Sequence, residues 1–123
     1  MSRPAAAARG LGFPRRMRLR DTVEFQRVFD SGPGRRGRYL VVWLRPSELA
    51  LWRLGVVASK RTFPRAVDRA RAKRLMREAF RLGAPERRGG VDAVAVARRA
   101  ILGAGMQQVK KDWERLVAGV GGA

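Results

Sequence analysis

The side chains best equipped for chemistry in this chain are the basic residues between Lys60 and Arg81. This segment holds nine Lys or Arg residues and only two acids, Asp68 and Glu78. Guanidinium groups donate paired hydrogen bonds to phosphate oxygens, and a Lys adds a compact positive charge. The segment is therefore predicted to bind a polyanion, with nucleic acid favoured over an anionic membrane surface.

The chain lacks the side chains that most enzymes use for acid–base and nucleophilic chemistry. It has no Cys and no His, which excludes disulfides, thiolate metal sites and Ser-His-Asp or Cys-His mechanisms. A protein-borne active site would have to use Asp, Glu, Lys or Tyr, so we expect no catalytic residue. Asp21, Glu24 and Asp30 could attract a metal, but capping and solvation are the favoured roles, and no metal site is assigned.

The overall composition is that of one small, folded, strongly basic domain. The 123 residues are 46% hydrophobic and carry a formal net charge of +18. No apolar run reaches the roughly 18 residues that a membrane span needs. The N-terminal residues lack the apolar core of a secretory signal. We therefore expect a cytoplasmic protein without a membrane partner.

Apolar periodicity and turn residues predict three helices and three strands. Asp21 has the position of an N-cap, with Glu24 at the capping-box spacing. The expected strands are 39–44, 53–60 and 91–97, the second antiparallel to the first, and the later helices are 66–82 and 106–118. This order, αββαβα with room for one extra strand, indicates the α+β class: a single-domain α/β sandwich with a small, mostly antiparallel sheet. Residues 1–17 are expected to form a flexible basic arm, 18–119 the domain and 120–123 a frayed tail.

The helix expected at 66–82 has two distinct faces. The spacing of its apolar residues predicts packing against the sheet, and these are Ala72, Leu75, Met76, Ala79 and Phe80. Lys73, Arg74, Arg77 and Arg81 fall on the opposite side. An ordinary solvated face would mix the two signs of charge, whereas this one has Glu78 alone near its edge. We therefore favour phosphate binding over a bland surface.

The order of residues in this region resembles the bacterial ribonuclease P protein subunit. An apolar strand led by Gly55 ends in Ser59-Lys60-Arg61, and the pair Ala66-Val67 follows. Arg69-Ala70-Arg71 then stands at the family's Arg-Asn-Arg motif, followed by Lys73-Arg74 and Arg77-Glu78. The resemblance extends from Leu19-Arg20 to the Trp113 helix. Ala70 replaces the family's Asn and can form none of its side-chain hydrogen bonds.

The resemblance implies a partner, a substrate and a fold. Family members bind the catalytic RNA of ribonuclease P and help it to remove the 5′ leader of precursor tRNA. The chemistry is performed by the RNA with Mg²⁺, which is bound mainly by RNA. The fold implied is ribosomal protein S5 domain 2-like, with a left-handed βαβ crossover. We expect the protein to be a monomer when it is free of RNA.

The resemblance also implies two sets of binding residues. The set facing the RNA subunit is Arg65, Arg69, Arg71, Lys73, Arg74, Arg77 and Arg81. The set facing the leader and tRNA is Phe25, Phe29, Val42, Ser59, Lys60 and Arg61. Simple core packing is the alternative role for Phe25 and Phe29. If Val42 faces the leader cleft, Trp43 and Tyr39 point to the opposite side of the sheet.

Three other functions remain open from the residues themselves. The chain could be another small basic RNA- or ribosome-associated protein with no role in tRNA processing. It could be a protein-only nuclease, in which case the purified protein would cleave precursor tRNA without RNA. It could also be a peripheral membrane protein that binds lipid through its basic arm.

Overall fold

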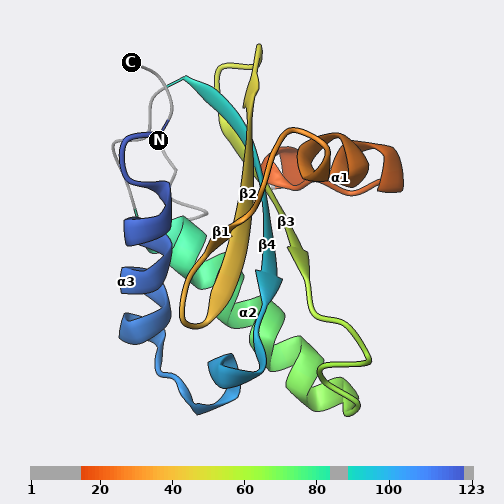
Figure 1. Cartoon of the computed structure of the whole chain (residues 1–123), viewed down its shortest axis with the longest axis vertical. Helices are drawn as coiled ribbons and strands as arrows, with labels where there is room; N and C mark the ends of the chain where they lie inside the picture. Colours follow the sequence, from red (N-terminus) through yellow and green to blue (C-terminus); the bar gives the residue numbers. More distant parts are fainter. Residues whose placement is uncertain (1–14, 84–88, 121–123) are drawn as a thin grey trace.

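The computed structural model describes residues 15–83 and 89–120 of the chain, and Figure 1 shows how its elements are arranged. The helical elements are η2 (Arg15–Met17), α1 (Thr22–Phe29), α2 (Ala66–Leu82), η3 (Arg99–Gly103) and α3 (Met106–Val117). The strands are β1 (Arg35–Arg36), β2 (Leu40–Ser47), β3 (Trp52–Val57) and β4 (Gly90–Ala97). The small α+β fold with three α-helices is the one predicted, and β1 is the extra strand.

The four strands form one mixed sheet in the order β1-β2-β4-β3. β4 pairs antiparallel with β2 along its whole length, from Leu40 opposite Ala97 to Ser47 opposite Gly90. On its other side β4 pairs parallel with β3, from Trp52 opposite Val91. β2 and β3 therefore run in opposite directions, as predicted, but they are separated by β4 rather than adjacent.

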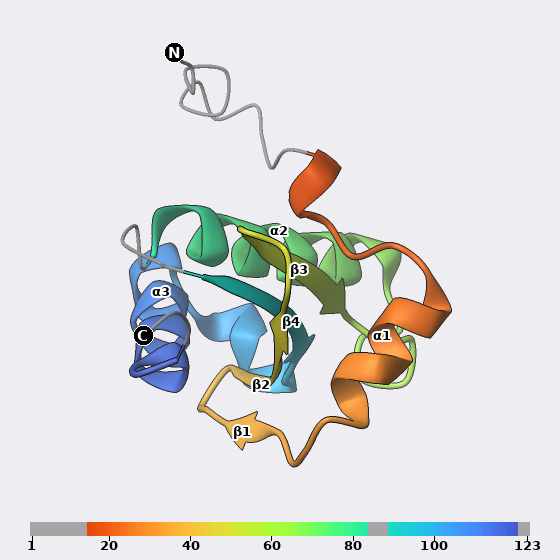
Figure 2. The ribbon, with the colours of Figure 1, turned by 90° about the horizontal axis from the view of Figure 1, so that it is seen from above.

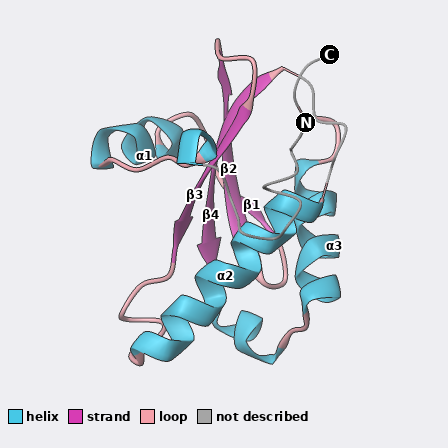
Figure 3. Ribbon diagram, turned by 180° about the vertical axis from the view of Figure 1, so that it is seen from behind, coloured by secondary structure: helices cyan, strands magenta, loops and turns pink. Residues whose placement is uncertain are grey.

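The connection from β3 through α2 to β4 is a left-handed crossover, as the resemblance implied. Figure 3 shows the sheet from the side on which α2 lies, with β3 to the left of β4 and both strands running downward. Moving from left to right under these conditions gives a left-handed turn. Nearly all such crossovers in proteins are right-handed.

The helices cover the sheet on both faces, which makes three layers. Figure 2 shows α1 and α3 on opposite sides of the sheet. The main core lies between the sheet and the pair α2 and α3, where Phe80 and Trp113 meet edge to face with ring centroids 5.6 Å apart. A smaller cluster joins Leu19, Val28 and Val94 under α1.

The element boundaries follow the local signals in most places. α2 has the predicted bounds, with the apolar face buried and Gly83 as its C-cap. Asp21 caps α1 by accepting a hydrogen bond from the Glu24 backbone N–H at 2.8 Å. The strand predicted from residue 53 to 60 ends early, at Val57, because Ser59 begins a turn in which its carbonyl accepts from Phe63 N–H. The predicted strand 39–44 instead extends to Ser47.

The expected terminal segments lie partly outside the described residues. Of the basic arm, 1–14 are not described, while Arg15–Met17 form η2 and Met17 packs against the main core. Of the tail, Val120 also packs against this core, and 121–123 are not described. No helix in the described ranges has the length and apolar character needed to cross a bilayer.

Candidate nucleic-acid interface

The exposed face of α2 carries a row of cations, because the apolar face of the helix is buried. Burial of the apolar positions against sheet and α3 turns the intervening basic positions outward. Arg65, Arg71 and Arg74 are exposed, and Lys73 is half-buried. Within the described ranges, none of these four forms an ion pair with an acid. Their charges are therefore available to an external anion.

Other basic residues of α2 are partly engaged with the protein itself. Arg69 donates to the carbonyls of Phe63 and Pro64, at 2.9 and 3.0 Å, and so stabilises the turn before the helix. Arg81 pairs with Glu78 at 2.7 Å, and this hydrogen bond raises the pKa of Arg81. Arg81 is thus the least available of the seven predicted RNA-binding residues.

Arg77 lies where α2 meets the segment that precedes α1. Burial lowers the pKa of Arg77 below its usual value, and the positive charge of Arg18 lowers it further. Arg18 is held in place by a parallel bridge to Leu54 of β3. The positive charge of Arg18 therefore adds to the basic surface beside α2.

The turn after β3 extends the basic surface beyond the helix. Ser59 accepts a hydrogen bond from Thr62 N–H at 3.1 Å, and Phe63 anchors the turn with a fully buried ring. Lys60 and Arg61 are exposed in this turn. The turn leads directly into α2, so Ser59, Lys60 and Arg61 adjoin the N-terminal end of the basic helix.

The α1 side of the sheet gathers aromatic rings. Phe25 and Phe29 are half-buried in the smaller cluster, so each ring both packs and reaches the surface. Phe25 lies directly on Gly55, where a side-chain Cβ would overlap its ring. Aromatic faces near a basic surface suit single-stranded nucleic acid, because every base can stack on them.

The prediction that Val42 lines this face is wrong. Val42 is fully buried on the opposite side of the sheet, in the core under α2 and α3. Its neighbour Trp43 points to the α1 side, where its ring meets Phe29 edge to face with centroids 4.9 Å apart. Alternation along β2 places Val42 and Trp43 on opposite sides, but both sides are apolar in the sequence, so the pattern alone does not show which one faces the main core.

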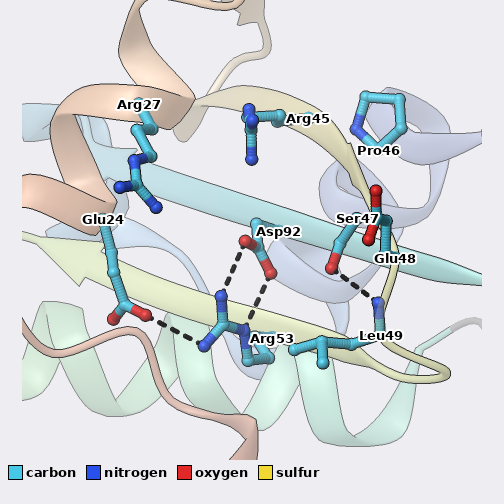
Figure 4. A pocket seen from close by; sticks show the side chains of 9 residues that line it. All are labelled: Glu24, Arg27, Arg45, Pro46, Ser47, Glu48, Leu49, Arg53 and Asp92. Atoms are coloured by element: carbon cyan, nitrogen blue, oxygen red, sulfur yellow. Dashed lines mark hydrogen bonds and ion pairs between the residues drawn. The ribbon is translucent and has the colours of Figure 1, made fainter.

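Sequence reasoning also missed the cluster that fixes α1 against the sheet. Arg53 on β3 donates two hydrogen bonds to Asp92 on β4, at 2.9 and 2.8 Å, and a third to Glu24 on α1 at 3.0 Å (Figure 4). The bonds to Asp92 raise the pKa of Arg53. The cluster lines a cavity of about 420 Å³ between α1 and the β2–β3 turn.

The three acids considered for a metal have other roles. Asp21 caps α1, Glu24 pairs with Arg53, and Asp30 accepts from the Gln26 side chain at 2.9 Å. Within residues 15–83 and 89–120, no group of three potential metal-binding side chains converges.

The sequence that folds into this basic helix, basic turn and aromatic face matches a known family. The model of the Ribonuclease P family covers residues 13–121 of this sequence. The chain belongs to the ribonuclease P protein family. The ribonuclease P protein component of Methylococcus capsulatus is 44% identical over 98 residues, which span 80% of this chain and 75% of that protein. The component of Caldanaerobacter subterraneus is 37% identical over 81% of this chain and 85% of the relative.

Solved structures of ribonuclease P proteins have the same fold. The protein from Thermotoga maritima superimposes with a TM-score of 0.73 at 27% identity, covering 85% of this chain and 98% of that one. The Staphylococcus aureus protein gives a TM-score of 0.71 at 26% identity over 82% and 92% of the two chains. As a ribonuclease P protein, this chain works in an endoribonuclease complex.

Proposed function

We propose that this ribonuclease P protein binds the catalytic RNA through α2 and the 5′ leader of precursor tRNA through the α1 side of the sheet. It thereby promotes the Mg²⁺-dependent removal of the leader, with Mg²⁺ bound mainly by RNA. The observation that supports this best is the row of cations on α2 without acidic partners, continuous with exposed Lys60 and Arg61. The free protein acts as a cytoplasmic monomer.

The leader is assigned to the rings of Phe25, Phe29 and Trp43. They lie on the sheet face opposite the α2 and α3 core, and all three are half-buried. Stacking on such rings tolerates any base, which suits leaders of different sequence. Ser59, Lys60 and Arg61 lie in the turn between β3 and α2, where they are placed to contact substrate and catalytic RNA together.

The chemistry is assigned to the RNA subunit. The chain has no His or Cys, and Tyr39, its single Tyr, is buried beside the main core. On the α1 side, Glu24 and Asp92 pair with Arg53, Asp21 caps α1, and Asp30 accepts from the Gln26 side chain. We therefore expect the purified protein, free of RNA, to leave precursor tRNA uncut.

Reconstitution with the host's catalytic RNA tests the proposal. Leader cleavage at low Mg²⁺ is measured with no protein, with the wild type and with Arg71→Glu/Arg74→Glu. We expect the wild type to accelerate cleavage and the double variant to lose most of this effect through weaker assembly. Lys110→Glu is a control on α3, where Lys110 faces Glu114. No acceleration by the wild type, or full assembly of the double variant, would contradict the proposal.

A further inference from the structure

A second basic surface lies away from the exposed face of α2. It is an open groove of about 360 Å³ between α3 and the turn that joins β1 to β2. Its lining residues are Arg38, Tyr39, Gln108, Lys111, Asp112 and Arg115. Figure 2 shows α2 and β1 at opposite sides of the molecule, with α3 along one edge. The groove and the exposed face of α2 therefore lie on different parts of the protein surface.

The one acid among the lining residues is turned into the protein. The Asp112 side chain is only 4% exposed. Its carboxylate accepts from the backbone N–H groups of Arg38 and Tyr39, at 3.2 and 2.8 Å, and from the Arg115 guanidinium at 2.8 Å. A buried carboxylate satisfied in this way fixes the turn and the helix relative to each other. It leaves the accessible charge of the groove positive.

The cations of the groove are accessible to a phosphate group. The Arg38 guanidinium lies over the Tyr39 ring, 5.6 Å from its centroid. This contact restricts the side chain and leaves the N–H donors at its edge free to bind. Arg115 uses one nitrogen for Asp112, yet its side chain is 64% exposed. Lys111 is exposed on the same flank of α3.

Lys110 and Lys111 are adjacent in sequence, but in the described part of the chain only Lys110 has an acidic partner. Lys110 lies 3.8 Å from Glu114 and so has a carboxylate partner. Lys111 has no acidic partner among the described residues. Helical geometry separates positions 110 and 111 by about 100°. The two residues provide a matched pair with the same charge, one inside the groove and one outside it.

We propose that this groove binds the phosphate backbone of a second RNA segment while α2 binds the first. The proposal rests on the proposed function, because the catalytic RNA is the polyanion that would reach both surfaces. Arg38, Lys111 and Arg115 would each contact a phosphate, without reading the sequence of bases. The protein would then hold two parts of the RNA at a fixed distance and orientation.

Tethered cleavage locates the two surfaces on the RNA. The chain has no Cys, so Gln108→Cys and Val67→Cys each give a single attachment site for an iron chelate that generates hydroxyl radicals. Val67 is an exposed position on α2. In the reconstituted complex, we expect probes at 108 and 67 to cut separate RNA segments. Cuts from 67 alone would overturn the groove proposal but support the role of α2, whereas cuts from neither would overturn both.

Salt dependence of RNA binding gives a second test. Lys111→Gln is compared with Lys110→Gln in the full chain with the catalytic RNA. Loss of one phosphate contact should reduce the slope of log K against log salt by about 0.7–0.9 and affinity by about three-fold at moderate salt. We expect this change for Lys111→Gln only. Equal slopes for the two variants would overturn the proposal.

Discussion

At the scale of single residues, the neighbours Val42 and Trp43 lie on opposite sides of β2 and have different proposed roles. Val42 is fully buried between the sheet and the helices α2 and α3. Trp43 is half-buried beside Phe29 on the α1 side. Only a ring that reaches the surface offers a face to a base, so we assign the proposed leader contact to Trp43.

Substitution of these two neighbours should separate the two roles. Trp43→Ala should weaken binding of precursor tRNA to the reconstituted complex by about 1–3 kcal/mol, the contribution of one stacked base, and leave mature tRNA unaffected. Val42→Ala should instead destabilise the fold by about 1–3 kcal/mol because it leaves a cavity. Binding isotherms and urea unfolding measure the two effects. An equal loss for precursor and mature tRNA would assign Trp43 to packing alone.

Ala70 is the position where the Arg-Asn-Arg motif is broken, and it is exposed on α2. Ala70→Asn adds one amide that can donate and accept hydrogen bonds at the RNA surface. We expect RNA affinity to rise by about 0.5–1.5 kcal/mol, the worth of one hydrogen bond. Helix propensity should lower the free energy of unfolding by about 0.5 kcal/mol. Unchanged RNA affinity would show that Arg69 and Arg71 bind without help from this position.

The resemblance to the ribonuclease P protein subunit predicts the wrong side of the sheet for Val42. The apolar spacing in α2 predicts its buried residues correctly, and a helix with one buried face turns its other positions outward. On β2 the resemblance points to Val42, whereas the residue on the α1 side is its neighbour Trp43, because adjacent residues of a strand face opposite sides of the sheet. Because the residues of β2 from Leu40 to Leu44 are apolar on both sides, only the packing of α1, α2 and α3 decides which side is the main core.

At the scale of elements, α1 depends on one arginine for its position on the sheet. Arg53 on β3 joins Asp92 on β4 and Glu24 on α1, and its side chain is 19% exposed. Asp92 lies opposite Arg53 in one ladder and opposite Arg45 in the other. The cluster therefore ties two strands and a helix together beside the rings proposed to bind the leader.

Removal of Arg53 should lower the free energy of unfolding. Arg53→Met leaves the buried Asp92 without its partner, which typically costs about 3–5 kcal/mol. Arg81→Met is the control, since its more exposed pair with Glu78 should contribute about 0.2–1 kcal/mol. Urea unfolding measures both. A similar small loss for the two variants would contradict the structural role of Arg53, and Arg53→Met/Asp92→Leu should recover part of the loss.

Single elements were predictable from the sequence, whereas their pairing was not. α2 was predicted at its full length because apolar spacing and Gly83 are local signals. The position of β4 between β2 and β3 depends on contacts between residues far apart in sequence. The same holds for Arg53 and Asp92, which are 39 residues apart. No local sequence pattern predicts contacts between residues that are far apart in the sequence.

At the scale of the whole molecule, the net charge of +18 is spread over more than one surface. The row lies on α2, whereas the groove is lined by α3 and the turn after β1, and α2 and β1 lie at opposite sides of the molecule (Figure 2). A protein with such a distribution is drawn to RNA from several orientations, and the release of counterions supplies much of the affinity.

The affinity for catalytic RNA should therefore depend steeply on salt. If six or more phosphates are contacted, affinity should fall about a thousand-fold between 50 and 200 mM monovalent salt. Filter binding across this range measures the slope for the wild type and for Arg71→Glu/Arg74→Glu, which should have a smaller slope. A flat response in the wild type would contradict an electrostatic interface.

The central place of β4 has a consequence for the order in which the protein is made and folded. β4 supplies the ladder on both of its sides, while β2 and β3 share none. During synthesis, a chain that has not reached Gly90 can form only the short β1–β2 pair of this sheet. Parallel pairing of distant segments is also slow. The nascent chain must keep β3 and the second edge of β2 unpaired until β4 has emerged from the ribosome.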